Sequence, residues 1–203
     1  MAPLTLVIET ATPACSVALL RGDEVVGEAH ALVGRGHAER LLPMIEALLA
    51  GRVPEAILVD CGPGSFTGLR VGLAAAHGLA IGWGLPLAGF SSMALLAANQ
   101  AEASELAVAL HGGHGQLFVQ SFACAPLRPT GGLASLSPLD AAAAIAAPLV
   151  IGSGAETLVA ARGFGRAEPA EARAANARRL PAALRGLPPA PIYGRAPDAR
   201  PAA

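Results

Sequence analysis

The sequence contains no lysine, and all 14 of its basic residues are arginine. A Walker A phosphate loop, a Schiff-base lysine and a serine–lysine dyad are therefore excluded, because each needs a lysine amine. Aromatic residues make up only 3% and charged residues 14% of the 203 residues, and the abundance of alanine, glycine, proline and arginine is typical of a chain from a GC-rich genome. Hydrophobic residues make up 53%, enough for a buried core in one domain or in two small ones.

Cysteines are few, odd in number and widely separated, so neither a disulfide framework nor a zinc pattern is predicted for Cys15, Cys61 and Cys124. The first residues lack a basic region and Glu9 interrupts their apolar run, so no signal peptide is expected. Residues 71–101 carry no charge, but this stretch is broken by Gly78, Gly82, Gly84, Pro86 and Gly89. It therefore predicts a buried helix, a strand and another helix rather than a membrane span. We expect a soluble, cytoplasmic protein without membrane contact.

The net charge of −1 argues against a chain that binds nucleic acid alone through a broad basic face. The charge is uneven, however. Residues 162–200 hold eight arginines against three acids, a local balance of +5 (8 − 3) that leaves −6 for the remainder. Such a segment either touches RNA or is simply solvated, and the sequence leaves both interpretations open.

Hydrophobic periodicity in the first half predicts three strands in a meander, with a hairpin turn at 21–23, followed by alternating helices and strands. Gly51 is the expected C-cap of the first helix. This order is that of the ribonuclease-H-like half of an actin-like fold, which predicts α/β architecture with a mixed sheet. The expected strands are 4–9, 16–20, 24–33, 56–60 and 85–90, and the expected helices are 37–50, 67–82 and 91–101.

The pattern restarts near residue 103. Strands are expected at 106–110, 117–122 and 149–151, a short helix at 138–147, and partly helical structure around 171–186. We therefore expect two lobes, each a mixed β-sheet flanked by helices. Residues 1–103 would form the ribonuclease-H-like N-terminal lobe, and residues 104–203 a smaller, less regular C-terminal lobe with an Arg/Pro/Ala-rich tail.

Residues 62–72 join a predicted strand to a predicted helix through the turn Gly62-Pro63-Gly64. Such a junction presents free backbone N–H groups at a helix N-terminus, where a phosphate or a partner could sit. The spacing is not the G-x-G-x-x-G of a dinucleotide fingerprint, and a tight turn with a cap at Ser65 or Thr67 is the alternative. Ser65 also lies one place late for the G-x-S-x-G motif of a serine hydrolase.

The helix predicted at 67–82 has small residues at a four-residue spacing, Gly68, Gly72 and Ala76. Its other faces are also mostly apolar, and a helix that is apolar all round is buried on more than one side. Burial inside the chain and burial against a partner are both compatible with this pattern. The residues predicted for a dimer interface here and on the preceding helix are His37, Leu41, Gly68, Leu69, Arg70, Gly72, Leu73, Ala76 and His77.

The end of the first strand, at Glu9 to Thr12, occupies the place where actin-like ATPases carry an acid, a glycine and a hydroxyl for phosphate. Here Ala11 replaces the glycine. A weak phosphate-like loop is therefore predicted, with no cofactor of its own, from Thr10, Thr12, Gly62, Gly64 and Ser65. The histidine pairs at 111/114 and 30/37 have no third ligand at a recognised spacing, so no metal site is predicted.

The chain resembles the TsaB (YeaZ) family of bacterial proteins of threonylcarbamoyladenosine biosynthesis in tRNA. The matching motifs are dense over 4–100, sparse over 105–190, and return near the end. They are Leu6-Val7-Ile8-Glu9-Thr10-Ala11-Thr12, Cys15-Ser16-Val17-Ala18-Leu19, His37-Ala38-Glu39-Arg40-Leu41-Leu42-Pro43, Gly62-Pro63-Gly64-Ser65-Phe66-Thr67-Gly68-Leu69-Arg70-Val71-Gly72, Ser91-Ser92-Met93-Ala94-Leu95-Leu96-Ala97 and Pro191-Ile192-Tyr193-Gly194-Arg195-Ala196-Pro197-Asp198.

The resemblance implies a two-lobed actin-like fold in a non-catalytic scaffold subunit. Family members pair with a homologous catalytic subunit, TsaD, and the ATPase TsaE is the third member. Together they transfer a threonylcarbamoyl group to the adenosine beside the anticodon. ATP and metal are then expected on the partner subunits, tRNA would be reached through the complex, and the chain alone would form a homodimer.

The catalytic paralogue binds metal through His-x-x-x-His, and the corresponding stretch here, Ser91 to Leu95, has no histidine. Two departures from the family pattern are Glu9, where aspartate is usual, and His111-Gly112-Gly113-His114, where the family has an Asp-Ala-Arg-like turn. The role of that turn is left open. The alternative functions are a glycoprotease-like metallohydrolase, which needs a metal or a nucleophile–base pair, and a free-standing ATPase, which Ala11 and the missing lysine disfavour.

Overall fold

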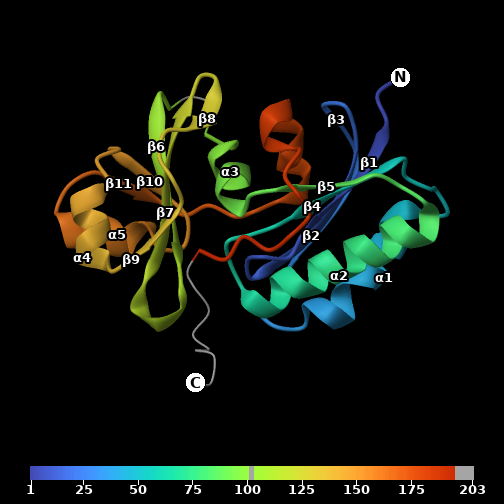
Figure 1. Cartoon of the computed structure of the whole chain (residues 1–203), viewed down its shortest axis with the longest axis horizontal. Coiled ribbons are helices and arrows are strands. Elements are labelled where there is room, and N and C mark those ends of the chain that lie inside the picture. Colours follow the sequence, from blue (N-terminus) through green and yellow to red (C-terminus); the bar gives the residue numbers. More distant parts are fainter. Residues whose placement is uncertain (101–102, 195–203) are drawn as a thin grey trace, which may run out of the picture.

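The computed structural model describes residues 1–100 and 103–194. Figure 1 shows two β-sheets side by side, each with a pair of helices on its outer face. The sheets are formed by separate halves of the chain, and the C-terminal part returns to the space between them. Within these residues no helix combines the length and the hydrophobicity that a membrane crossing needs.

The first sheet has the strand order β3-β2-β1-β4-β5. The first three strands form the predicted antiparallel meander, and the last two run parallel to β1. The ribonuclease-H-like order predicted from the sequence is confirmed. The strands are β1 (Leu4–Glu9), β2 (Ala14–Arg21), β3 (Glu24–Leu32), β4 (Ala56–Asp60) and β5 (Leu87–Phe90).

Two helices, α1 (His37–Leu49) and α2 (Phe66–Trp83), pack against the outer face of this sheet and form one hydrophobic core with it. Ser65 is the N-cap of α2, one of the two caps predicted, and its hydroxyl accepts a hydrogen bond from the N–H of Gly68. The C-cap predicted for α1 is one residue too late. Ala50 takes that position in the left-handed region, at φ 47°, and Gly51 follows at φ 81°.

The second sheet repeats this arrangement, with the strand order β11-β10-β6-β7-β8. Strands β6, β7 and β8 are antiparallel, and β10 and β11 run parallel to β6. Its strands are β6 (Glu105–His111), β7 (Leu117–Cys124), β8 (Leu127–Pro129), β10 (Leu149–Ile151) and β11 (Arg166–Glu168), and β9 (Ala134–Leu136) also pairs with β7. The helices α4 (Pro138–Ala144) and α5 (Ala155–Arg162) pack on it.

The sequence did not predict α5, β8, β9 or β11. Three of these are strands of three residues, too short to show an alternation of apolar and polar side chains. Helix α5 has only two fully buried residues, Ala155 and Leu158, so its apolar periodicity is faint.

Between the two sheets lie the short helix α3 (Ser92–Ala97), which ends earlier than predicted, and the segment 172–180. The partly helical stretch expected at 171–186 forms two 3-10 turns, Ala174–Arg179 and Ala182–Leu184, separated at Pro181. Segment 172–180 buries four alanines and Leu180 against the inner face of the first sheet. The sequence-based boundary at 103 assigns this segment to the second lobe, whereas its contacts are with the first sheet.

The chain then returns along the edge of the first sheet. Leu187 pairs with Gly89 of β5, and the N–H of Ile192 donates to the carbonyl oxygen of Cys61 at 2.7 Å. The closing motif from Pro191 onward is described as far as Gly194, and its last four residues lie outside the described ranges. The N-terminal lobe is therefore built from both ends of the described chain.

Candidate functional site

Two acidic side chains end the neighbouring parallel strands β1 and β4. Ile8 pairs with Val59 in the register, so Glu9 and Asp60 follow side by side. Both are buried, with 0% and 1% of their surface exposed. Because side chains alternate along a strand, both carboxyl groups face the inner side of the sheet, toward α3 and segment 172–180.

Asp60 is held by two hydrogen bonds to one of its oxygens. Its Oδ1 accepts from the N–H of Gly62 at 2.7 Å and from the hydroxyl of Ser92 at 2.8 Å. Its Oδ2 is buried and has no hydrogen-bond partner within the described chain. Burial raises the pKa of Asp60 to about 7, because the two hydrogen bonds offset only part of the cost of desolvating its charge.

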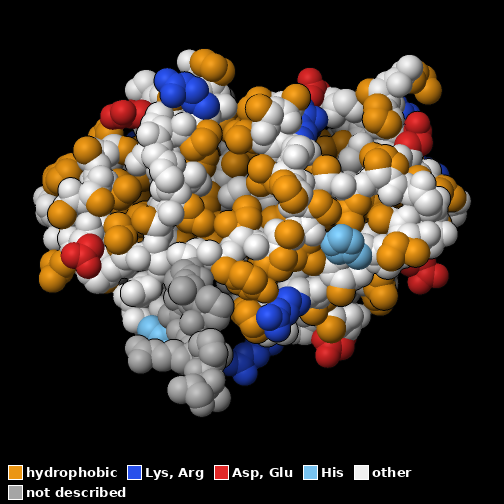
Figure 2. Space-filling model, viewed as in Figure 1, with side chains coloured by type: hydrophobic (Ala, Val, Ile, Leu, Met, Phe, Trp, Pro, Cys, Tyr) orange, Lys and Arg blue, Asp and Glu red, His pale blue; other side chains and the backbone are white. Residues whose placement is uncertain are grey.

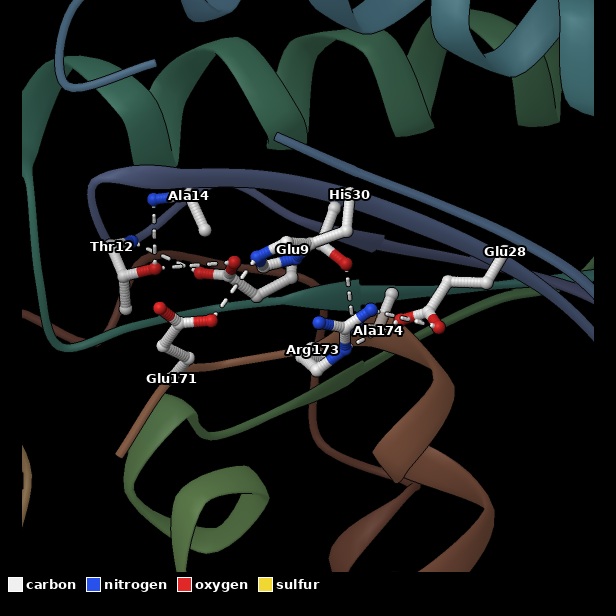
Figure 3. Close-up of polar contacts among 9 residues, drawn as sticks. Glu9, Thr12, Ala14, Glu28, His30, Glu171, Arg173 and Ala174 are labelled. Carbon is white, nitrogen blue, oxygen red and sulfur yellow. Dashed lines mark hydrogen bonds and ion pairs between the residues drawn. The ribbon is translucent and has the colours of Figure 1, made fainter. Parts of the chain in front are cut away.

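Glu9 is held by the residue three places later. One carboxylate oxygen accepts from the N–H of Thr12 at 3.0 Å and the other from the Thr12 hydroxyl at 3.2 Å, as Figure 3 shows. Burial raises the pKa of Glu9 well above its usual range, and the nearby charge of Asp60 raises it further. The site therefore disfavours simultaneous ionisation of both acids.

The residues of the predicted phosphate-like loop do come together, because the turn at 62–65 closes on the loop at 10–12. The N–H of Ser65 donates to the carbonyl oxygen of Ala11 at 2.6 Å. A Cβ on Gly64 would lie 2.0 Å from that same oxygen, so only glycine fits there. The Thr10 hydroxyl donates to the carbonyl oxygen of Gly68 at 2.8 Å. The Thr12 hydroxyl donates to the Glu9 carboxylate, and the Ser65 hydroxyl accepts from the N–H of Gly68. The hydroxyls of this loop are thus engaged with the chain itself.

The C-terminal segment lies across the same end of the sheet. Glu9 on β1 pairs with Ser16 on β2, and Ser16 pairs with His30 on β3, so the three side chains form a row. The N–H of Ala174 donates to the hydroxyl of Ser16 at 2.9 Å, and Nε2 of His30 lies 3.5 Å from a carboxylate oxygen of Glu171. Figure 3 shows this segment packed over the row.

A bidentate ion pair fixes the same segment. Nε and Nη2 of Arg173 each lie 3.2 Å from the carboxylate of Glu28 on β3. The pair is separated by 145 residues in the sequence, and no local pattern predicts such a contact. Sequence reasoning missed it, and missed the pairing of Ala174 with Ser16 for the same reason.

The small-residue stripe of α2 packs inside the lobe, which decides between the two alternatives that the sequence left open. A Cβ on Gly72 would lie 2.2 Å from the hydroxyl of Thr10, and one on Gly68 would lie 2.1 Å from the carbonyl oxygen of Thr10. Six of the residues predicted for a dimer interface are buried in the chain itself: Leu41, Gly68, Leu69, Gly72, Leu73 and Ala76.

His37, also predicted for the interface, is 5% exposed. Its Nε2 lies 3.0 Å from the carbonyl oxygen of Thr12 and 3.1 Å from that of Ala14. Because both neighbours can only accept, this nitrogen carries the proton and donates. The histidine thereby ties the start of α1 to the loop between β1 and β2.

The remaining two predicted interface residues, Arg70 and His77, are exposed on α2. Cζ of Arg70 lies 3.7 Å from the centre of the Phe66 ring, and its Nη2 lies 3.5 Å from the hydroxyl of Tyr193. The two rings are 6.1 Å apart, and Phe66 and Tyr193 are 56% and 49% exposed. An exposed stripe thus follows α2 at helical spacing through Phe66, Arg70, Ala74, His77 and Ile81.

The two histidines of the turn between β6 and β7 lie far from these features along the chain. His111 ends β6, and His114 lies in the 3-10 turn Gly113–Gly115 with φ 61°. Over residues 1–100 and 103–194, no three His, Cys, Asp or Glu side chains are grouped closely enough to hold a metal ion.

Comparisons with known proteins agree with this architecture. The family model described as TsaD, tRNA N6-adenosine threonylcarbamoyltransferase, matches residues 29–125. The chain is 42% identical over 97 residues to the tRNA threonylcarbamoyladenosine biosynthesis protein TsaB of Escherichia coli and 36% identical over 99 residues to that of Bacillus subtilis. YeaZ from Pseudomonas aeruginosa superposes with a TM-score of 0.80 at 27% identity, over 95% of this chain and 100% of that one.

The chain resembles the TsaB/YeaZ family. Its fold is the two-lobed, actin-like arrangement of mixed sheets flanked by helices. The two alignments with curated members of this family cover 45% and 46% of the chain, and the chain spans only 42% and 43% of the length of those members. The structural match to YeaZ extends over the second sheet as well, where the sequence motifs are sparse.

Proposed function

We propose that this chain is a non-catalytic subunit of the assembly that forms threonylcarbamoyladenosine in tRNA. The curated relatives that match 45% and 46% of the chain are named as biosynthesis proteins of this modified nucleoside. The family model that spans residues 29–125 describes the transferase TsaD, so the chain is similar to the enzyme over this region. Similarity to both favours a paralogue that works beside the transferase.

The contacts that close the two loops after β1 and β4 against each other support the non-catalytic part of the proposal. Gly64 and Ser65 lie directly against Ala11, and the hydroxyls of Thr10 and Thr12 are bonded within the chain. A phosphate placed between the two loops would have to displace these contacts. Glu9 and Asp60 beside it are buried acids, which oppose the approach of an anion whenever they are charged. We therefore expect ATP and metal on the partner subunits.

The exposed stripe of α2 is the surface that we propose for pairing with the transferase. Phe66, Arg70 and Tyr193 are the residue types that concentrate binding energy at protein interfaces, and here they already contact one another. Ile81 is 82% exposed on the same stripe. Figure 2 shows hydrophobic side chains spread over the middle of this view, with a basic side chain and a histidine among those in its lower half. A face of about 800 Å² would be ordinary for a stable complex.

The proposal includes three further partners. In the absence of the transferase, the same stripe would pair with a second copy of the chain. The ATPase TsaE would join the pair as a third member, and tRNA would be reached mainly through the complex. Such an assembly would work in the cytoplasm.

Co-purification with the TsaD homologue of the same organism tests the pairing. Ile81→Glu should reduce recovery of the complex at least about tenfold, because it places a charge within a desolvated contact. Leu139→Glu on α4 is the matched control, since Leu139 is 74% exposed on the other lobe. Equal recovery of the two variants would reject the α2 stripe as the interface.

Calorimetric titration of the isolated chain with ATP tests the non-catalytic part. We expect no binding at millimolar nucleotide. Tight ATP binding, accompanied by hydrolysis, would favour a free-standing ATPase instead.

A further inference from the structure

A hollow of the molecule lies between the two lobes, away from Glu9 and Asp60. It is a cleft of about 930 Å³, bounded by the turn between β2 and β3, the end of α3, the hairpin between β7 and β8, and the C-terminal 3-10 turns. Figure 1 shows these elements facing one another, with α3 and β8 on one side and the red C-terminal turns on the other. It is larger than the 380 Å³ pocket beside β7 and β9.

The charged groups that line this cleft are mainly arginines. Arg178, Arg179 and Arg185 face Asp23, which leaves a balance of +2 (3 − 1) when all four are ionised. The chain as a whole carries −1. The cleft is therefore a local concentration of positive charge on a molecule that is otherwise slightly acidic, and it attracts anions.

Two of the arginines have guanidinium N–H groups that donate no hydrogen bond within the described chain. Nε of Arg178 is buried and has no hydrogen-bond partner within the described chain. The side chain of Arg179 is exposed and forms no hydrogen bond or ion pair with the described residues. Arg185 differs, because its Nε donates to the carbonyl oxygen of Leu180 at 2.6 Å and holds the turn. Unsatisfied guanidinium donors beside a cleft favour a ligand with several acceptor oxygens.

The rest of the lining narrows the class of ligand. Asn99 and Gln100 contribute amides, and the remaining side chains are alanine, leucine, proline and a cysteine. No aromatic side chain lines the cleft within the described residues, so a nucleobase would find no stacking surface. A guanidinium pair suits phosphate, which it can bind through two parallel hydrogen bonds.

We propose that this interlobe cleft binds backbone phosphates of RNA through Arg178 and Arg179. The choice of RNA rests on the proposed function, whereas the choice of phosphate rests on the cleft itself. Contacts of this kind position a nucleic acid without reading its sequence. The chain would thus add phosphate contacts to the complex although its overall charge is negative.

Fluorescence anisotropy of a labelled tRNA transcript with the full chain tests the proposal, over a series of salt concentrations. The double variant Arg178→Gln/Arg179→Gln should bind about tenfold more weakly and should lower the slope of log K against log salt by about 1 to 2. Arg35→Gln/Arg40→Gln is the matched control. It removes the same charge from exposed positions before and within α1, on the far side of the first sheet, and should leave binding unchanged.

Folding and ligand identity are tested separately. Since Arg178 is partly buried, Arg179→Gln alone provides a variant that keeps the turn intact, with about threefold weaker binding expected. Equal losses in the cleft and control pairs, or no tRNA binding by the unaltered chain, would overturn the proposal. Binding of sodium tripolyphosphate without binding of tRNA would also overturn it, in favour of a small anion. No partner chain is present in this assay and no RNA is needed for co-purification, so failure of one proposal is distinguishable from failure of the other.

Discussion

Glu9 and Asp60 lie at the carboxyl ends of two adjacent parallel strands, and both side chains are buried. The hydrogen bonds that the two carboxyl groups accept are too few to stabilise two full negative charges. The pKa values of both are raised, mainly by burial. The loops that follow the two strands fold over the pair and bond to it. The stability of this end of the first sheet therefore depends on whether these two acids are protonated.

The first prediction concerns pH. Because the pKa of folded Asp60 is raised from 3.8 to about 7, the folded state binds the proton more tightly than the unfolded state, and this stability is lost as pH rises from about 4 to 7. Asp60→Asn removes the titration. Its free energy of unfolding should increase relative to that of the unaltered protein by on the order of 4 kcal/mol between pH 4 and pH 8. Urea denaturation at several pH values measures the difference, and a constant difference would contradict the prediction.

The second prediction compares two glycines on one helix. Gly72→Ala would push a methyl group against the hydroxyl of Thr10 and should destabilise the fold by about 1–3 kcal/mol. Gly78→Ala, where the new Cβ has no neighbour within 4 Å, should instead stabilise it by about 0.5–1 kcal/mol through helix propensity. Thermal denaturation of both variants measures these changes in stability. Shifts of the same sign would show that the packing of α2 is not as described.

A third prediction tests the cap of α2. Ser65→Ala removes the acceptor for the N–H of Gly68 and should lower the free energy of unfolding by about 1 kcal/mol. Ser104→Ala is the control, because the Ser104 side chain is exposed and forms no hydrogen bond within the described chain. If chemical denaturation finds equal effects for the two variants, the cap contributes nothing.

The fourth prediction separates the apolar and ionic attachments of segment 172–180 to the first sheet. Leu180→Ala should cost about 2–4 kcal/mol, because this side chain is fully buried. Arg173→Gln should cost only about 0.5–1 kcal/mol, since the ion pair with Glu28 is partly exposed and screened. Guanidinium denaturation of the two variants gives the ranking, and the reverse order would mean that the ion pair holds the segment.

Sequence reasoning predicted the first sheet well because local signals fix it. Its strands alternate or are wholly apolar, Gly62-Pro63-Gly64 ends β4, and Ser65 caps the next helix. The same reasoning placed Thr10, Thr12, Gly64 and Ser65 at one site, and the structure brings them together. It could not decide whether Gly72 faces the sheet or a partner, since glycine is compatible with either.

The C-terminal quarter shows the opposite case. Its alanines carry little apolar surface, so Ala174 and Ala177 leave no readable periodicity although both are fully buried. Their place is set by contacts with Ser16 and Glu28, about 150 residues away, which no local pattern contains. In the sequence, the arginines of the cleft could be recognised only as part of the net positive charge of residues 162–200.

The return of residues 172–192 to the first sheet has a consequence for synthesis of the chain. A ribosome releases the meander and its two helices early, but Val7, Ala18 and Leu58 on the inner face await Ala174 and Leu180, which emerge only after the whole second sheet. Until then the nascent lobe exposes an apolar sheet face, and closing such a long loop is slow. Truncation before residue 172 should therefore yield an aggregation-prone N-terminal half, and a circular permutant that joins the two ends should complete that lobe early in translation.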